Sequence, residues 1–454
     1  MSSHIVEVCE VKAIEPHPMA DRLEICIVKG WRVCTGRGQF RPGDKCIYIP
    51  PNSILQAPIY RDRLNIEKYL APLPEDEEGE VPPGLRVRAC RMRGMESYGV
   101  IDKLRPECGD DPNWPVGTDV CEFLGITKYE PYVDEAAGEP THPLFRTFTE
   151  IEQYQEFPDA IRDGTDVVIT EKIHGMNARL ALIIEDGIKK KLVGSCDMQL
   201  KEFKEVRCRF KYDEFKDYKF LTENGESWEA IDWDTALYAP LGRIFQIEEK
   251  GQYTYWQIFQ VKSVIGQALG VIKAKKVRHT NKDGGKWEPV QERSMFWKAF
   301  DMLDYWGLLE RVLNISVSGT PISSIILYGE LWPSQDMKYG ATVKYVSLFA
   351  ISVNGRYLDY DDVAALCNSK QIPMVTPLYR GPFAKGLVDL YTSGPTTLCE
   401  PKDAGKFKGR EGIVIQATKE TINEALLPSR TNGRAILKSI SVDYLDRKGG
   451  TELK

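Results

Sequence analysis

The sequence predicts an α+β protein in which a small antiparallel β-barrel precedes a larger strand-rich domain with helices. Two observations support this prediction. Short apolar segments separated by turns follow one another closely in residues 1–125, as they do in small barrels. Longer apolar strands and one well-defined helical segment follow in the rest of the chain. The length of 454 residues also fits two or three domains.

Residues 1–125 contain the strands expected of the barrel. Residues 85–93 alternate apolar and basic side chains, so as a half-buried strand they would project their arginines from one face. The acidic residues 71–84, which also contain Pro and Gly, are expected to form a surface loop. The other expected strands are residues 5–13, 23–28, 31–35 and 45–49, with turns at 17–18, 36–38 and 41–44.

The pattern is lost after residue 125, and residues 126–146 are expected to form a linker. The second domain is expected over residues 147–454, with an aromatic- and lysine-rich insert of no clear period at about 209–290. Apolar side chains at three- and four-residue spacing predict a helix over residues 294–313. The expected strands of this domain are one that begins at Asp166 and residues 325–328, 345–353, 412–417 and 435–440.

The composition predicts a folded protein. Hydrophobic residues make up 42% of the chain and charged residues 28%, which excludes wholesale disorder. The formal net charge of -6 argues against non-specific coating of nucleic acid, but it permits a local basic groove. The 11 cysteines are scattered and no pair has C-x-x-C spacing, so a reducing compartment is the simpler interpretation.

No apolar run approaches the roughly 18 to 20 residues that a membrane helix needs. The first residues also lack the pattern of a signal peptide. We therefore expect an intracellular, cytoplasmic monomer without a membrane partner.

Common phosphate-binding and hydrolase motifs are absent: G-x-x-x-x-G-K-[ST], the dinucleotide fingerprint, H-E-x-x-H and G-x-S-x-G. The informative segment is TEKIHGMN, residues 170–177, in which a buried-looking strand ends at Lys172 and Gly175 permits a tight turn. A lysine nucleophile needs a neutral amine, and partial burial or neighbouring cations lower its pKa. The segment alone is also compatible with a surface lysine beside a turn.

Four further features follow in order along the chain. Glu330 closes the apolar strand that ends in Tyr-Gly-Glu, and Phe349 is the aromatic residue of the strand 347–351. Glu411 precedes a buried strand, and Lys438 lies on the last strand. Each feature alone is typical of an ordinary strand edge.

Taken together, these segments resemble the nucleotidyltransferase motifs of the covalent ligase and capping-enzyme superfamily, in the same order. Most members have K-x-D-G, and His174 resembles the K-x-H-G variant of a branch of RNA ligases with an amino-terminal OB domain. Residues 20–55, 86–101, 117–131 and 437–445 resemble other parts of that branch, so the resemblance covers roughly 1–208 and 291–454. It implies an OB-fold barrel followed by an ATP-grasp-like nucleotidyltransferase domain.

The resemblance implies an ATP-dependent RNA ligase that uses Mg²⁺ or Mn²⁺. Its substrates would be RNA 3′-hydroxyl and 5′-phosphate ends, sealed at nicks in RNA/RNA or RNA/DNA duplexes during RNA repair. One alternative is a capping-type guanylyltransferase that uses GTP, although capping enzymes carry the OB domain after the catalytic domain. The other is a non-catalytic RNA-binding protein on a ligase scaffold, against which the retained motif residues argue.

The resemblance also implies a role for each motif residue. Lys172 would be the nucleophile, and Lys438 would lie near the α-phosphate and lower the pKa of Lys172. Glu411 would hold the catalytic metal, and Glu330 the ribose hydroxyls, with a share in the metal site. Phe349 would stack on the adenine.

Four other residues of the nucleophile segment are candidates for the site. The backbone of Thr170 and Glu171 is expected to contact the adenine edge. Asn177 would contact the ribose or cap the turn. His174 would support the metal or Lys172, or would bond a carbonyl of the turn.

Two positions depart from the family pattern. The RNA-binding surface is predicted from runs of charged residues alone. Cys196 stands where many relatives have arginine, and Ile436 where many have lysine, which leaves Lys438 and Arg434 as cations of the last motif. Basic runs and aromatic residues of the insert could bind RNA, or could be a solvated face and a small core. The candidate RNA contacts are Arg86, Arg88, Arg91, Arg93, Lys406, Lys408 and Arg410.

Overall fold

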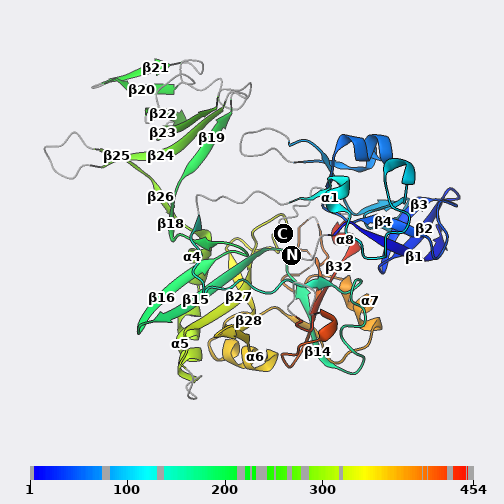
Figure 1. The fold of residues 1–454 in the computed structure, drawn as a ribbon. Coiled ribbons are helices and arrows are strands. Elements are labelled where there is room, and N and C mark those ends of the chain that lie inside the picture. Colours follow the sequence, from blue (N-terminus) through cyan, green and yellow to red (C-terminus); the bar gives the residue numbers. More distant parts are fainter. Residues whose placement is uncertain are drawn as a thin grey trace.

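The computed structural model describes residues 5–73, 82–129, 138–211, 220–224, 227–231, 243–249, 252–262, 268–277, 286–315, 321–400, 402–405, 407–426, 433–445 and 447. Figure 1 shows an amino-terminal barrel, a larger two-sheet body and a third sheet that projects from that body. Within the described residues, no helix has both the length and the apolarity to cross a bilayer.

The amino-terminal domain is built on a curled antiparallel sheet of five strands in the order β10-β4-β1-β2-β3. The edge strands β3 and β10 also contact each other, so the sheet closes toward a barrel, as predicted. Alternating side chains fill its interior, among them Val11, Val28 and Tyr48. The strands are β1 (Glu7–Pro16), β2 (Leu23–Val28), β3 (Trp31–Gly36), β4 (Lys45–Ile49) and β10 (Val100–Lys103).

Smaller strands and helices complete this domain. The order β11-β5-β7-β6 forms a second sheet, and β8 pairs with β9. The strands are β5 (Ser53–Leu55), β6 (Ala71–Pro72), β7 (Leu85–Arg86), β8 (Cys90–Met92), β9 (Met95–Ser97) and β11 (Thr127–Lys128). The helices are η1 (Pro58–Arg63), η2 (Glu67–Tyr69), η3 (Pro106–Cys108) and α1 (Cys121–Leu124).

The predicted single strand over residues 85–93 is wrong. It is divided between β7 and β8, because the Val87 N–H donates to the Ser53 carbonyl at 2.8 Å while β8 turns away to pair with β9. The arginines therefore do not share one face. The Arg86 guanidinium lies 4.6 Å from the centre of the Tyr129 ring, and Arg91 pairs with Asp443 of the larger domain at 2.6 Å.

The larger domain contains two sheets. The first has the strand order β12-β17-β16-β15-β27-β28-β29, and the second has the order β13-β32-β31-β14-β30. The strands of the first are β12 (Gly138–Glu139), β15 (Met176–Glu185), β16 (Ile188–Gly194), β17 (Gln199–Leu200), β27 (Ser324–Trp332), β28 (Tyr345–Val353) and β29 (Arg356–Tyr357). The strands of the second are β13 (Glu152–Gln153), β14 (Asp166–Lys172), β30 (Pro377–Pro382), β31 (Gly412–Ala417) and β32 (Ile436–Ile440).

Helices cover the outer faces of both sheets. Phe300, Leu308 and Val363 bring α4, α5 and α6 into one core with the first sheet. Val388 of α7 packs with Ile413 and Ile415 of the second sheet. The helices of the larger domain are α4 (Met295–Phe300), α5 (Tyr305–Ile315), α6 (Tyr360–Ser369), α7 (Gly386–Thr392), η5 (Glu424–Leu426) and α8 (Val442–Leu445).

The helix predicted over residues 294–313 is two helices, α4 and α5. Ser294 caps the first, since its hydroxyl accepts the Phe296 N–H at 3.3 Å. Asp304 starts the second in the same way, because its carboxylate accepts the Gly307 N–H at 2.9 Å. An acidic cap three residues before a helical glycine therefore divides what apolar spacing alone predicts to be continuous.

The insert forms its own antiparallel sheet, in the order β19-β24-β23-β22-β20-β21 with β25 on β24. The pair β18–β26 joins it to the body, and it stands apart at the top of Figure 1. Phe245, Ile258 and Val271 are buried in it, whereas Tyr253 is exposed. Tyr212 and Trp233 lie outside the described residues. The strands are β18 (Phe203–Glu205), β19 (Arg207–Lys211), β20 (Phe220–Asn224), β21 (Ser227–Ile231), β22 (Ile244–Glu249), β23 (Gln252–Lys262), β24 (Ala268–Val277), β25 (Lys286–Pro289) and β26 (Gln291–Arg293).

Candidate active site

The candidate site lies where the chain passes from one sheet of the larger domain to the other. Lys172 ends β14 in the second sheet, and Met176 begins β15 in the first. Gly175 belongs to the connection and packs closely, since a Cβ there would lie 2.4 Å from the Leu331 carbonyl oxygen. The Gly175 carbonyl also accepts a hydrogen bond from the Gln335 amide. The turn between Lys172 and Met176 is therefore fixed by close packing against Leu331 and by a hydrogen bond from Gln335.

Lys172 is half-buried and paired with a carboxylate. Its Nζ lies 2.5 Å from Glu411 Oε1, and its backbone lies opposite Gly412 of β31. Burial lowers the pKa of Lys172, but the charges of Glu411 and Glu330 outweigh burial and raise it. The expected lowering of this pKa is therefore wrong for the arrangement seen here. The Lys172 amine therefore stays protonated as long as the Glu411 carboxylate is paired with it.

Two carboxyl groups flank Lys172 and differ in ionisation. Burial raises the pKa of Glu411, but Lys172 and His174 more than compensate and hold it at about 2. Burial raises the pKa of Glu330 to about 8, with Lys172 opposing the rise and Glu411 adding to it. At neutral pH the site therefore contains one carboxylate and one mostly neutral carboxylic acid.

Glu330→Gln is expected to stabilise the ligand-free protein at alkaline pH. The folded pKa of Glu330 lies above its ordinary value of 4.5, so the stability that this group contributes is lost as the pH rises through about 8. The amide does not ionise. The melting temperature of the Glu330→Gln variant should therefore exceed that of the wild type by about 3 °C or more near pH 8.5, and the two should be nearly equal near pH 5. Differential scanning calorimetry at both pH values measures this.

The exposed Glu122→Gln variant is the control for that measurement, since it makes the same chemical change on the surface. It should not alter the pH dependence of the melting temperature. Equal melting temperatures for Glu330→Gln and the wild type at both pH values would contradict the raised pKa of Glu330.

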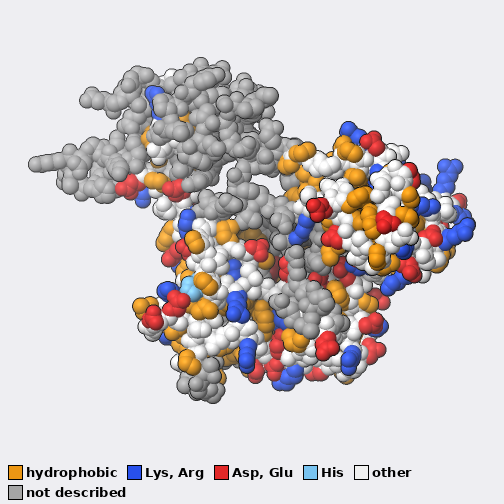
Figure 2. Space-filling view, viewed as in Figure 1, with side chains coloured by type: hydrophobic (Ala, Val, Ile, Leu, Met, Phe, Trp, Pro, Cys, Tyr) orange, Lys and Arg blue, Asp and Glu red, His pale blue; other side chains and the backbone are white. Residues whose placement is uncertain are grey.

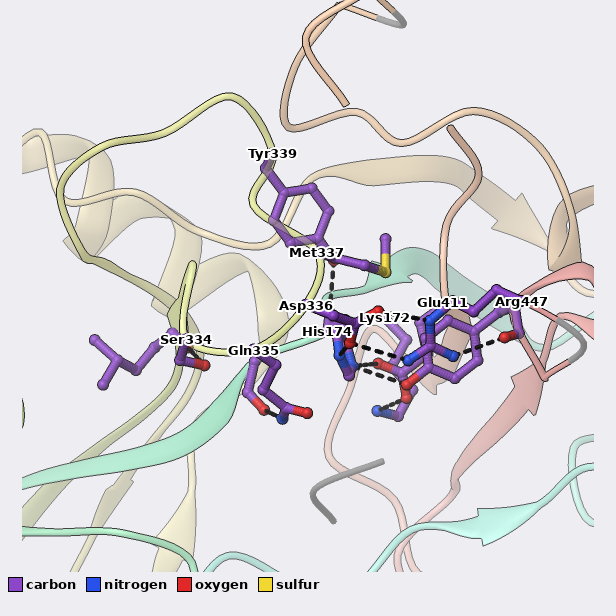
Figure 3. A network of polar contacts seen from close by, with 12 residues as sticks. Lys172, His174, Ser334, Gln335, Asp336, Met337, Tyr339, Glu411 and Arg447 are labelled. Carbon is purple, nitrogen blue, oxygen red and sulfur yellow. Dashed lines mark hydrogen bonds and ion pairs between the residues drawn. The ribbon is translucent and has the colours of Figure 1, made fainter. Parts of the chain in front are cut away.

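His174 is the centre of a network of polar contacts, which Figure 3 shows between Lys172 and Arg447. His174 Nε2 lies 2.7 Å from Asp336 Oδ1, and Arg447 Nε donates to Asp336 Oδ2 at 2.9 Å. On the other side of the ring, Nδ1 lies 2.8 Å from the Tyr444 hydroxyl and 3.5 Å from Glu411 Oε2. An Asp carboxylate paired with Arg only accepts, so Nε2 carries a hydrogen. The ring thus stands between Asp336 and Glu411.

Asn177 and Glu330 lie side by side, because they are direct partners in the β15–β27 pair. Asn177 Oδ1 is a buried atom that accepts no hydrogen bond within the described part of the chain. A buried unsatisfied acceptor is costly, so it points to a ligand that donates to it. This observation fits the ribose hydroxyl groups that both residues are predicted to contact.

The predicted adenine contacts already have protein partners. Phe349 is partly buried, and its ring centre lies 4.8 Å from that of Phe148 in an edge-on arrangement. Thr170 is buried in β14, which is paired on both sides in the second sheet. The Glu171 N–H donates to the Thr376 carbonyl at 3.2 Å, and its carboxylate accepts hydrogen bonds from Thr396 and Thr397. These three positions remain predictions as nucleotide contacts.

Lys438 lies on the same face of the second sheet as Lys172. Thr170 and Lys438 are both opposite Val414, two residues from the Lys172–Gly412 pair, and side chains two residues apart share a face. Arg434 does not face the site in this way. It forms two hydrogen bonds with Glu420, at 2.5 and 2.8 Å, and its guanidinium lies 3.6 Å from the centre of the Tyr357 ring.

Comparison with known proteins agrees with this geometry. A family model described as RNA ligase matches residues 165–440, more than half of the chain. The chain belongs to the RNA ligase family. A second model, described as an OB-fold domain, matches residues 5–104. A comparison with curated proteins finds no match.

Solved structures with the same fold include three of Naegleria gruberi RNA ligase. One, with PPi, is 19% identical with a TM-score of 0.59, and the match covers 98% of each chain. A mutant with AMP and Mn is 19% identical with a TM-score of 0.60 and 98% coverage of each chain. Another mutant with ATP and Mn is 19% identical with a TM-score of 0.59, covering 97% of this chain and 98% of that one. The predicted fold, an OB barrel followed by a ligase domain, is confirmed.

The candidate RNA contacts of this RNA ligase differ in their exposure to solvent. Arg88, Arg93 and Lys408 are exposed, and Lys406 lies outside the described residues. Arg410 is buried, 7% exposed, and donates to the Tyr391 carbonyl at 3.4 Å, so it does not belong to a solvent-facing basic run. In Figure 2 one group of Lys and Arg side chains lies at the outer edge of the β1–β3 part of the OB domain, and others are scattered over the larger domain.

Four residues around the RNA ligase site were missed in the sequence. Asp336, Tyr444 and Arg447 contact His174 or each other only after folding, and no local pattern marks them. Arg179 is fully buried beside the departure at Cys196. It donates to the Ser195 carbonyl at 2.7 Å and to the Phe145 carbonyl at 2.9 Å. It supports the backbone beneath Cys196 rather than replacing the missing arginine at the surface.

Proposed function

We propose that this RNA ligase is ATP-dependent and joins RNA 3′-hydroxyl and 5′-phosphate ends through a covalent lysyl-AMP on Lys172. The observation that carries this proposal is the placement of Lys172 at a tight turn between two sheets. Glu411 lies at hydrogen-bonding distance from the Lys172 amine. Asn177, which comes just after the turn, lies opposite Glu330. Naegleria gruberi RNA ligase, which shares the fold, has been solved with ATP and with AMP.

The proposed reaction has three steps that balance in atoms and charge. The neutral amine of Lys172 attacks the α-phosphorus of ATP, which forms a P–N bond, breaks the P–O bond to pyrophosphate and releases a proton. A 5′-phosphate oxygen of an RNA end then attacks the phosphorus of the lysyl-AMP, which forms a P–O–P bond, breaks the P–N bond and returns a proton to the amine. A 3′-hydroxyl attacks the RNA 5′-phosphorus, which forms the phosphodiester, breaks the P–O–P bond and releases AMP and a proton. Positioning and neutralisation of negative charge do most of the catalytic work in such transfers.

Residues near Lys172 have the chemistry to serve these steps. Lys438 lies on the same face of the sheet, where its ammonium group would offset charge on the α-phosphate. Asn177 and Glu330 would hold the ribose, Phe349 would stack on the adenine, and the backbone at Thr170 and Glu171 would contact the base edge. His174 supports this arrangement through its contacts with Glu411 and Asp336.

The residues present fit a hard divalent cation such as Mg²⁺ or Mn²⁺. Glu411 and Glu330 supply carboxylate oxygens, which such cations prefer. The described residues contain no cluster of three or more protein ligands, so a bound ion would complete its shell with water and phosphate oxygens. When bound, it would neutralise negative charge on the phosphates.

The proposed substrates are nicks in RNA/RNA or RNA/DNA duplexes. Exposed Arg88, Arg93 and Lys408 supply positive charge for the phosphate backbone without selecting a base sequence. The OB domain offers a second surface for nucleic acid beside the catalytic domain.

The test is incubation of the full chain with α-labelled ATP or GTP and Mg²⁺ or Mn²⁺, followed by a denaturing gel. We expect label from ATP to remain on the protein, to require the metal, and to be released when a nicked duplex with a 5′-phosphate RNA end is added. Label from GTP alone would replace this proposal with a capping-type guanylyltransferase. A folded protein that takes no label would be a non-catalytic RNA-binding scaffold.

A further inference from the structure

The helix α8 lies between the OB domain and the candidate active site. Its residues Val442 and Leu445, three apart on one face, pack against the interior cluster of the OB barrel. Asp443, on the same short helix, pairs with Arg91 of the OB domain at 2.6 Å. One side of α8 is therefore held by the OB domain.

The other side of α8 is held by the site. Tyr444 and Arg447 are also three residues apart, and their side chains reach His174 Nδ1 and Asp336 respectively. The Arg447 guanidinium lies 3.6 Å from the centre of the Tyr444 ring, so the two side chains form one unit. The start of the helix is attached as well, because the Ser441 N–H donates to the Glu411 carbonyl at 2.8 Å.

A second contact fixes the OB domain against the edge of the second sheet, next to β13. Lys29, in the turn between β2 and β3, pairs with Glu7 and lies 3.8 Å from Glu156 of the catalytic domain. Gly30 is required next to it, since a Cβ there would lie 2.6 Å from the Gln155 carbonyl oxygen. The OB domain therefore contacts the strand edge beside Lys438 as well as α8.

We propose that α8 is a positioning element that couples the docking of the OB domain to the orientation of His174. This inference rests on the proposed function. Tyr444 and the Arg447–Asp336 pair hold the imidazole between Asp336 and Glu411, and Glu411 in turn contacts Lys172. Because α8 is a single turn, a shift of its OB-facing side moves Tyr444 with it, and Arg447, which lies just beyond the helix and packs on the Tyr444 ring, moves as well. Docking of the OB domain thereby sets the arrangement around the nucleophile.

The test compares three changes in the full chain: Arg91→Asp, Asp443→Arg, and the two together. Arg91→Asp places two carboxylates at the OB side of α8 and touches neither His174 nor Lys172. We expect it to slow lysyl-AMP formation about three-fold, a size set by a partly exposed ion pair, and we expect the charge swap to restore the rate. Tyr444→Phe, which removes only the hydroxyl at His174, should slow it about five- to ten-fold.

The structural readout is the ¹⁵N spectrum of the imidazole groups, in a chain with five histidines. The His174 signals, assigned by their loss in His174→Asn, should show hydrogen on Nε2 in the wild type. They should move in Tyr444→Phe and in Arg91→Asp, and return in the charge swap. The exposed Arg37→Asp, which makes the same charge change elsewhere on the OB domain, should leave signals and rate unchanged.

The outcomes separate the two proposals. If the wild type takes label from ATP, and Arg91→Asp leaves both the His174 signals and the rate unchanged, the coupling through α8 is refuted while the lysyl-AMP proposal stands. A change of the His174 signals in Arg91→Asp that the charge swap does not reverse would also refute the coupling through α8. If the wild type takes no label, the lysyl-AMP proposal fails, and the His174 signals still decide whether α8 couples the OB domain to the site.

Discussion

Lys172→Arg should reduce lysyl-AMP formation at least about a thousand-fold, because it removes the nucleophile while keeping its positive charge. A guanidinium group stays protonated and can pair with Glu411, so the buried carboxylate is not left alone. The fold should therefore survive, with a melting temperature close to that of the wild type. The measurement is the rate at which α-labelled ATP labels the chain in a single turnover.

A second substitution shows what the charge contributes. Lys172→Met should be equally inactive, but it leaves Glu411 without its nearest cation and should also lower the melting temperature. The control is Lys189→Met, which removes an exposed lysine of β16 that forms a surface ion pair with Glu310. Label that persists on Lys172→Arg would show that another residue accepts the AMP.

Glu411→Gln should lower the rate of lysyl-AMP formation at least about a hundred-fold at a metal concentration that just saturates the wild type. Two effects oppose each other in this variant. The loss of the carboxylate removes the charge that raises the pKa of Lys172, so a neutral amine becomes available at lower pH. It also removes the proposed metal ligand, and this loss dominates because an amide binds Mg²⁺ or Mn²⁺ more weakly than a carboxylate does. Single-turnover labelling across a metal titration measures the result.

The pH profile distinguishes the two effects. Lysyl-AMP formation requires the neutral amine, so the rate should rise with pH, and the rise should begin at lower pH in Glu411→Gln than in the wild type. Glu400→Gln, an exposed carboxylate earlier in the chain, should behave as the wild type in both measurements. A metal titration of Glu411→Gln that matches the wild type would assign the metal to other groups.

Much of the fold and of the motif chemistry follows from local patterns. The strands over 345–353 and 412–417 were predicted with the bounds that the structure has, since the alternation or continuity of apolar side chains is a property of neighbouring residues. The helix over 294–313 failed where Asp304 caps a new helix, because a cap depends on one side chain and not on apolar spacing. The strand over 85–93 failed because β7 pairs with the distant strand β5, whereas β8 folds back on β9 through a tight turn at Arg93 and Gly94.

The family followed from the chain itself, since Lys172, Glu330, Glu411 and Lys438 occur in the order of its motifs, and the same motifs make Lys172 the proposed nucleophile. The protonation state of Lys172 did not follow from the sequence. Its amine is paired with a carboxylate 239 residues away, and the strength of a charge interaction depends on distance through space and on burial. For the same reason Asp336, Tyr444 and Arg447 join the site only through folding, which brings a loop and a terminal turn against His174.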